Sequence, residues 1–223
     1  MAPIIVFDVN ETLLDLAPIR EWFANRFGDE PTATMWFGEL LRLSFVSAAA
    51  DQYVPFPELA ASALATTAER FGASIGDGDI SHIGGVLTTL SAHADVIEGL
   101  DLLVDAGFKL VALTNSPLET ANVQLANAMI ADRFDNIMSV ELVGRFKPHH
   151  SVYEAAAAAL TVTTSGLVMV AAHDWDIAGA MAAGCTGVYV SRPGQLYSPA
   201  FPQPTLIASD ITDAANQIAA TYT

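Results

Sequence analysis

The stretch Ile4-Ile5-Val6-Phe7-Asp8-Val9-Asn10-Glu11-Thr12-Leu13-Leu14-Asp15 decides the fold of this chain. Its first four residues form a continuous β-branched and aromatic run, the pattern of a strand that helices cover on both faces. Such strands occur in parallel sheets, so the run predicts an α/β protein. The aspartate at position 8 follows directly, at the carboxyl end of the strand, where open parallel sheets bind their ligands.

Strand-like and helix-like segments alternate through the rest of the chain. Apolar runs recur at 110–113, 137–140, 167–170 and 187–190, and helical patterns lie between them at 96–106, 118–128, 151–160 and 176–183. This alternation predicts a Rossmann-like, doubly wound parallel sheet.

The segment 16–94 breaks the alternation. It contains helix-like stretches at 18–27, 32–48 and 56–71 and no convincing strand, and its Gly-Asp cluster at 72–79 is expected to be a surface loop. We therefore predict a core domain of residues 1–15 and 95–223, and an inserted helical cap domain of residues 16–94.

Composition excludes several classes of partner. The 223 residues include 25 acidic and 9 basic side chains, a formal charge of −16, which argues against binding to nucleic acid. No apolar run reaches the ~20 residues that cross a bilayer. The single Cys185 excludes an intramolecular disulfide and is expected to be a buried thiol. These features are typical of a cytoplasmic protein.

Polar side chains follow the predicted strands at the edge where ligands bind. They form four groups, which are Asp8 with Thr12, then Thr114-Asn115-Ser116, then Lys147-Pro148, and finally His173-Asp174-Trp175-Asp176. An aspartate that ends the first strand, a threonine four residues later, a Thr-Asn pair and a Lys-Pro pair, in this order, resemble the haloacid dehalogenase superfamily. The resemblance spans the whole chain, including the place where the cap is inserted.

Three residues bear on the choice of branch within this superfamily. Its phosphatases need a second aspartate as general acid, and this chain has Asn10 there, which cannot transfer the proton. They also need carboxylates for magnesium after the fourth strand, where alignment places Ala171 and Ala172. We therefore predict no metal and no cofactor. If the alignment shifts by two residues, Asp174 and Asp176 could replace the alanines, so a magnesium-dependent phosphatase remains an alternative.

Among the branches without magnesium, the chain most resembles the type II 2-haloacid dehalogenases. The opening stretch, the segment Phe146-Lys147-Pro148-His149-His150-Ser151-Val152-Tyr153 and the pair Trp175-Asp176 carry this resemblance. It implies that Asp8 displaces halide from a small anionic 2-haloacid, and that water cleaves the resulting ester to give a 2-hydroxy acid. It also implies a homodimer. A second alternative is the opening of a small epoxy acid, because a branch resembling the epoxysuccinate hydrolases pairs its nucleophile with a His-x-x-Asp pattern, as in His173 and Asp176.

The resemblance also implies a role for each candidate residue. Lys147 would keep the nucleophile ionised, and Thr12 would orient it. Tyr153 would contact the lysine and a carboxylate. The substrate would meet polar donors and an apolar pocket, to which we assign Asn10, Thr114, Asn115, Ser116, Phe56 and Trp175.

The chain departs from the dehalogenases at three positions. His173 stands where they carry an asparagine, and Ala171 where they carry a serine; we predict His173 as the general base, oriented by Asp176. In the cap, Phe37 stands where they carry an anion-binding arginine after a tryptophan. Phe37 and the next arginine, Arg42, are kept as substrate-binding candidates. The remaining histidines, His82, His93, His149 and His150, are expected to be solvated.

Overall fold

The computed structural model describes residues 2–28 and 31–223, and it confirms the doubly wound α/β fold. Six parallel strands lie in the order β3-β2-β1-β4-β5-β6, with β1 between the two strands that carry most of the polar groups. The strands are β1 (Ile4–Phe7), β2 (Leu110–Thr114), β3 (Asn136–Ser139), β4 (Leu167–Ala171), β5 (Thr186–Val190) and β6 (Leu206–Ala208).

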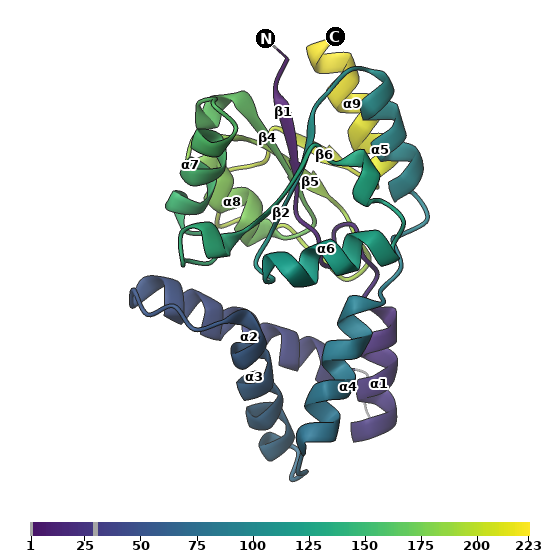
Figure 1. Cartoon of the computed structure of the whole chain (residues 1–223), viewed down its shortest axis with the longest axis vertical. Coiled ribbons are helices and arrows are strands. Elements are labelled where there is room, and N and C mark those ends of the chain that lie inside the picture. Colours follow the sequence, from purple (N-terminus) through teal and green to yellow (C-terminus); the bar gives the residue numbers. More distant parts are fainter. Residues whose placement is uncertain (1, 29–30) are drawn as a thin grey trace.

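Helices cover both faces of the sheet. Helices α5 and α9 pack against each other on one face, and α7 and α8 lie on the other (Figure 1). Helix α6 contacts β3 and also packs against α4 (Asp77–Thr88), a helix that precedes α5 in the sequence. These core helices are α5 (Val96–Asp105), α6 (Leu118–Asn127), α7 (His150–Ala159), α8 (Asp174–Ala182) and α9 (Ile211–Tyr222).

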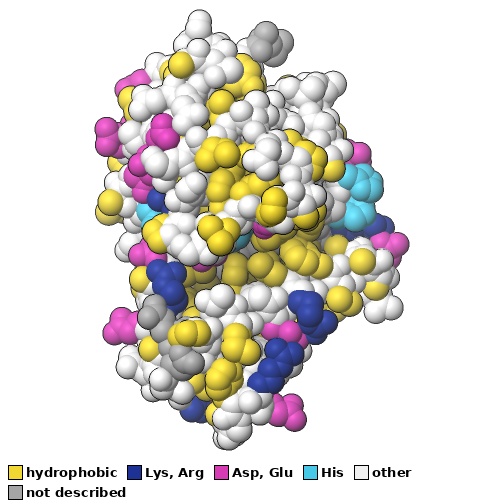
Figure 2. Space-filling model, turned by 180° about the vertical axis from the view of Figure 1, so that it is seen from behind, with side chains coloured by type: hydrophobic (Ala, Val, Ile, Leu, Met, Phe, Trp, Pro, Cys, Tyr) yellow, Lys and Arg dark blue, Asp and Glu magenta, His cyan; other side chains and the backbone are white. Residues whose placement is uncertain are grey.

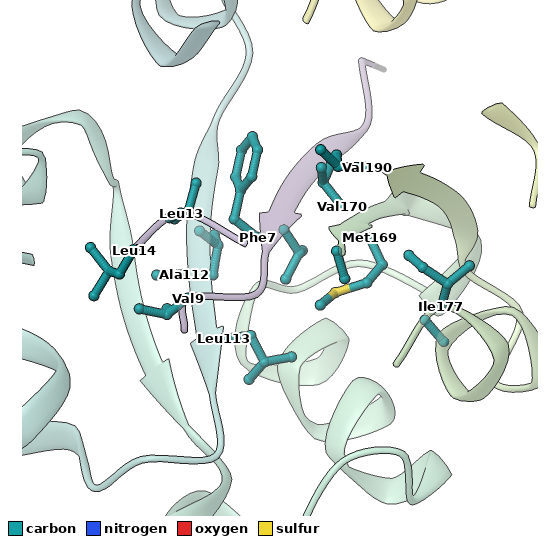
Figure 3. Close-up of a cluster of buried hydrophobic side chains, with 14 of the residues drawn as sticks. Phe7, Val9, Leu13, Leu14, Ala112, Leu113, Met169, Val170, Ile177 and Val190 are labelled. Atoms are coloured by element: carbon teal, nitrogen blue, oxygen red, sulfur yellow. The ribbon is translucent and has the colours of Figure 1, made fainter. Parts of the chain in front are cut away.

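The buried core surrounds the carboxyl end of β1. All four β1 residues are buried, as the continuous apolar run predicts. The loop that follows is also anchored in the core, because Val9, Leu13 and Leu14 are fully buried around Phe7 (Figure 3). The polar residues of this loop are therefore held on a rigid apolar base.

Four helices follow β1 and lie beneath the sheet, in the lower half of Figure 1. They are α1 (Ala17–Phe27), α2 (Pro31–Ala49), α3 (Phe56–Arg70) and α4 (Asp77–Thr88). Aromatic packing joins α1 to α2, because the ring centroids of Phe23 and Trp36 lie 5.3 Å apart. The exact division into a core of 1–15 and 95–223 and a cap of 16–94 stays a prediction.

The Gly-Asp cluster at 72–79 was predicted to be a surface loop, and this is wrong for its last part. Helix α4 begins inside the cluster, at Asp77. The Asp79 carboxylate, in the first turn, accepts a hydrogen bond of 3.0 Å from the Gly76 amide and so caps the helix. Acidic side chains in a first turn also complement the helix dipole.

The sequence patterns did not reveal the last strand and the last helix, β6 and α9. Helix α9 packs closely on α5, where a Cβ at Gly99 would lie 2.7 Å from Ile211. Glycine at this position therefore permits the contact.

Three further observations concern the chain as a whole. Within the described ranges, no helix combines the length and apolar character needed to cross a membrane. Cys185 is buried, as expected. Lys109 is exposed and directly precedes β2, so it lies at the edge of the sheet opposite the carboxyl ends of the strands.

Candidate active site

The polar groups that follow β1, β2 and β4 meet at one edge of the sheet. Phe7, the last residue of β1, pairs with Ala112 of β2 and with Val170 of β4. The next residues along the three strands therefore bring Asp8, Asn115 and His173 together. This arrangement follows directly from parallel strands with β1 in the middle.

Lys147 connects two buried carboxylates. Its Nζ donates to Asp8 Oδ1 at 2.8 Å, to Asp176 Oδ2 at 2.7 Å and to the Leu113 carbonyl at 2.9 Å. All three ammonium protons therefore have acceptors. The Lys147 side chain is fully buried, so the ammonium is an internal counter-ion and not a solvated surface charge.

Two contacts fix the lysine in this place. The Lys147 backbone N–H donates to Asn115 Oδ1 at 3.0 Å, which ties the Lys-Pro segment to the end of β2. Helix α8 approaches the same segment at Gly179, where any Cβ would overlap with Pro148. The Lys147–Pro148 peptide bond is cis.

Charge pairing controls the ionisation of these groups. Burial alone would raise the pKa of Asp8, but the charge of Lys147 and the hydrogen bond with His173 outweigh it, and the pKa lies well below its usual range. Burial would likewise lower the pKa of Lys147, yet Asp176 and Asp8 raise it. Asp8 is therefore a carboxylate at neutral pH, as a nucleophile requires.

The loop after β1 holds Asp8 through Thr12. The Thr12 hydroxyl donates to Asp8 Oδ2 at 2.7 Å and accepts from the Ala172 N–H at 3.0 Å. The Thr12 carbonyl accepts from Arg192 Nη2 at 2.8 Å. The Thr12 hydroxyl therefore links the Asp8 carboxylate to the backbone that follows β4.

Tyr153 lies next to the second carboxylate. Its hydroxyl donates to Asp176 Oδ1 at 2.6 Å, and burial raises the pKa of the phenol well above its usual range. Burial also raises the pKa of Asp176, although Lys147 opposes the shift. Asp176 is therefore held by Lys147 on one oxygen and by Tyr153 on the other.

His173 has two carboxylate partners. Its Nδ1 lies 3.0 Å from Asp8 Oδ2, and its Nε2 lies 3.0 Å from Glu11 Oε2. The expectation that Asp176 orients His173 is wrong, because Asp176 bonds to Lys147 and Tyr153. Burial would lower the pKa of His173, but hydrogen bonds to Asp8 and Glu11 raise it to about 9.

Glu11, which the sequence did not single out, completes this group. Its backbone adopts a left-handed conformation, with φ of 65°. The Glu11 N–H donates to the Leu14 carbonyl at 2.9 Å, and the Glu11 carbonyl lies 3.1 Å from His93 Nε2. His93 was expected to be solvated; it is instead partly buried because it supports this loop.

An apolar cavity of about 210 Å³ adjoins the site between the sheet and the cap helices. Figure 2 shows hydrophobic side chains gathered along this boundary. Four predicted substrate-binding residues line the cavity, namely Asn10, Phe37, Phe56 and Ser116. Asn10 Nδ2 donates to Ser116 Oγ at 3.1 Å. Among the described lining residues there is no lysine or arginine.

The other predicted binding residues do not line this cavity. Trp175 stacks on His173, with ring centroids 5.0 Å apart. Thr114 is buried and its hydroxyl accepts from the Ser116 N–H, so it shapes the loop. The structure does not bring Arg42 to the site: its guanidinium donates to Glu39, 2.7 Å away, and its side chain is 57% exposed. Arg42 lies five positions after Phe37, about 500° around the helix, which places it on another side of α2.

The donor set does not fit a magnesium ion. Ala171 and Ala172 offer no side-chain oxygen, and Lys147 already lies between Asp8 and Asp176. The two carboxylates that a shifted alignment would offer already have partners: Asp174 accepts from the Trp175 and Ser198 amides, and Asp176 from Lys147 and Tyr153. In the part of the chain that the structure describes, no cluster of three or more His, Cys, Asp or Glu is arranged to hold a metal.

Several curated proteins resemble this chain in sequence. The (S)-2-haloacid dehalogenase of Pseudomonas sp. (strain YL) is 28% identical over 197 residues, which cover 86% of this chain and 84% of the relative. The (S)-2-haloacid dehalogenase 1 of Pseudomonas sp. (strain CBS-3) is 29% identical over 189 residues, or 84% and 83% of the two chains.

Solved structures show how widely the fold is used. The L-2-haloacid dehalogenase of Xanthobacter autotrophicus with covalently bound chloropropionic acid has a TM-score of 0.90 at 21% identity, covering 98% of both chains. A HAD hydrolase of Bacillus subtilis bound to magnesium has a TM-score of 0.79 at 13% identity, covering 98% and 99%. The fold alone therefore does not decide the chemistry. The sequence profile of the haloacid dehalogenase-like hydrolases matches residues 3–184, more than half of the sequence, and this chain belongs to that family.

Proposed function

We propose that the protein is a hydrolytic (S)-2-haloacid dehalogenase that works without a metal ion. The observation that carries the proposal is the set of side chains around Asp8. The buried Lys147 ammonium keeps the carboxylate ionised, while Ala171 and Ala172 offer no carboxylate for a magnesium ion. The relatives named above, which match most of the chain, support the choice of substrate class.

In the first half-reaction, an Asp8 carboxylate oxygen attacks C2 of the haloacid from the side opposite the halogen. The C–O bond forms as the carbon–halogen bond breaks, and the halide leaves with the bonding electrons. This displacement inverts the configuration at C2. Thr12 and Lys147 hold Asp8 in position, which makes the attack effectively intramolecular once the substrate is bound.

In the second half-reaction, water attacks the carbonyl carbon of the Asp8 ester. The product is a 2-hydroxy acid, and Asp8 is regenerated with one oxygen from water. Lys147, which contacts an Asp8 oxygen, would stabilise negative charge that develops there. His173 lies beside the same carboxylate and would accept the proton of the attacking water.

The cavity would receive the carbon chain of the substrate. Its walls are largely apolar, and they include the hydrogen-bonded pair Asn10 and Ser116. Ser116, with the neighbouring Asn115, would donate hydrogen bonds to the substrate carboxylate. Phe37 stands where the dehalogenases carry an arginine, so these neutral donors would hold the anion without a guanidinium.

Charge and cysteine content bear on the substrate, the partners and the cellular location of the enzyme. We propose a small anionic substrate, no nucleic-acid partner and a cytoplasmic location, supported by the formal charge of −16 and the single buried cysteine. A homodimer is proposed from the family resemblance alone. Light scattering during size-exclusion chromatography would measure the mass in solution.

The decisive experiment offers 2-haloacids, epoxy acids and phosphoesters to the protein in EDTA. Halide release from an (S)-2-haloacid, with no phosphate release on adding magnesium, is the expected result. A single turnover in ¹⁸O-labelled water should place the label in the Asp8 carboxylate. Asp8→Asn should reduce halide release by at least about 10⁴-fold. Turnover that requires magnesium, or label that appears directly in the 2-hydroxy acid, would overturn the proposal.

A further inference from the structure

Glu11, the second carboxylate partner of His173, has no role yet in the proposed chemistry. The Glu11 carboxylate lies 3.0 Å from His173 Nε2, on the side of the ring opposite Asp8. A charged partner at each nitrogen fixes both the direction of the ring and its protonation. The Trp175 ring also stacks on the imidazole, with centroids 5.0 Å apart, and the tilted Phe37 ring lies 5.9 Å away.

In the resting enzyme at neutral pH, the raised pKa of His173 favours the imidazolium form. The ionisable groups in contact with it are Asp8 from the end of β1 and Glu11 from the next loop, and these outweigh burial to set its pKa at about 9. Lys147 acts through the other oxygen of Asp8. The N-terminus of α8, where His173 is the N-cap, disfavours the cation. An imidazolium has no lone pair, so it cannot accept a proton from water.

Formation of the ester removes one of these two anions. When Asp8 bonds to carbon and halide leaves, the Asp8 carboxylate becomes a neutral ester. His173 then keeps one charged partner, Glu11, while burial and the helix N-terminus still oppose its charge. The Nδ1 proton becomes the easier one to lose, because Glu11 accepts the Nε2–H bond. The lone pair that appears on Nδ1 faces the ester.

We propose that Glu11 is a positioning residue that holds His173 by Nε2, so that Nδ1 becomes the base for ester hydrolysis only after Asp8 has been alkylated. This inference rests on the proposed function. Glu11 thus provides the orientation of the His173 ring that Asp176 was expected to supply.

The protons released and taken up balance over one catalytic cycle. His173 releases its Nδ1 proton to solvent after halide leaves, then takes a proton from the attacking water. The hydroxide oxygen bonds to the Asp8 carbonyl carbon, the ester C–O bond breaks, and the remaining hydroxide proton passes to the departing alkoxide. The products are the 2-hydroxy acid, Asp8 carboxylate and His173 imidazolium, with one halide and one proton in solution.

The local backbone agrees with a dedicated role for Glu11. A residue other than glycine with positive φ is strained, and such strain persists only where surroundings enforce it. Here the Leu14 carbonyl and His93 fix the Glu11 backbone on both sides. The strained conformation aims the carboxylate at His173.

The first test compares Glu11→Gln with Glu21→Gln, which removes an exposed carboxylate from α1. Quenched mixtures are analysed for halide and for the Asp8 ester by mass spectrometry. In Glu11→Gln we expect the first-turnover halide burst to stay within a few-fold of wild type, while ester hydrolysis slows about 100-fold and ester accumulates. Glu21→Gln should match wild type. A normal burst without accumulated ester in Glu11→Gln would overturn the inference yet leave the proposed function intact.

The second test needs no Glu11 variant. A pH-indicator dye follows proton release during a single turnover of wild type near neutral pH. The proton should appear with the halide and not with ester hydrolysis. In addition, ¹⁵N-histidine NMR of Asp8→Asn, which makes Asp8 neutral, should show His173 titrating at lower pH than in wild type. Proton release that coincides with ester hydrolysis, or an unchanged titration, would refute the inference; absence of halide release from wild type would instead refute the proposed function.

Discussion

Lys147 Nζ lies 2.7 Å from Asp176 Oδ2, and both side chains are completely buried. The same ammonium serves Asp8, so one cation balances two carboxylates in the interior. The stability of the fold and the state of the nucleophile therefore depend on the same side chain.

Replacing Lys147 with methionine should destabilise the protein and abolish turnover. The change leaves two buried carboxylates without their counter-ion, and breaking a buried ion pair in this way costs about 3–5 kcal/mol. Urea unfolding measures the loss of stability, and halide release measures activity.

Lys109 provides the matched control, because it is the only other lysine in the sequence and is exposed. Lys109→Met should change the unfolding free energy by no more than about 0.5 kcal/mol. Equal effects of the two substitutions would show that Lys147 is not an essential counter-ion.

The stability of the fold should fall between neutral and alkaline pH. The pKa of His173 rises on folding from 6.5 to about 9, so its contribution is complete below pH 6.5 and is lost as the pH rises through about 9. The shift corresponds to roughly 3 kcal/mol. Asp8, whose pKa is lowered, contributes above its usual value of 3.8 and loses this contribution only in acid.

Unfolding free energies of wild type and His173→Asn at pH 6 and pH 10 would check this prediction. The difference between the two proteins should shrink at the higher pH. His150→Asn, at an exposed histidine of α7, should show no such pH-dependent difference. A constant gap between wild type and His173→Asn would mean that the site does not hold an imidazolium.

Phe37→Arg should strengthen substrate binding. Phe37 lines the cavity and its ring lies 5.9 Å from that of His173, so a guanidinium there could reach the substrate carboxylate. A charge-assisted hydrogen bond contributes about 1.5–3 kcal/mol, and we expect KM for 2-chloropropionate to fall about tenfold. Val46→Arg, at a position of α2 that is 51% exposed, should leave KM unchanged. The same KM in both variants would indicate that the neutral donors already satisfy the substrate carboxylate without a guanidinium.

The cavity should admit haloacids with longer carbon chains. About 210 Å³ is the liquid volume of roughly seven water molecules, enough for several chain atoms beyond C2. Ala61→Leu narrows the cavity and should lower kcat/KM for 2-bromohexanoate by about tenfold or more, with less effect on 2-bromopropionate. Ala65→Leu, exposed on the same helix, is the control. If Ala61→Leu reduces both substrates equally, the cavity does not hold the chain.

Much of this architecture could be predicted from local patterns. Continuous apolar runs mark buried parallel strands, and strand ends in such a sheet converge, which is why Asp8, Asn115 and His173 could be placed together before the structure was known. The family assignment also followed from these strand-end motifs, and the profile match confirms it.

The partner of His173 was harder to predict. Its spacing to Asp176 suits one helical face, but contacts with Lys147 and Tyr153 take both Asp176 oxygens. Glu11 reaches the ring only because its backbone adopts positive φ, which no periodicity encodes. Helix α4 was missed because glycine and aspartate also favour turns, whereas here they cap a helix.

The uneven exposure of the two lysines has a practical consequence. Amine-directed cross-linkers would find Lys147 shielded and Lys109 open to solvent. Because Lys109 precedes a strand whose other end leads into the catalytic edge, coupling through its side chain would anchor the enzyme by its far side and leave the cavity facing the bulk solution.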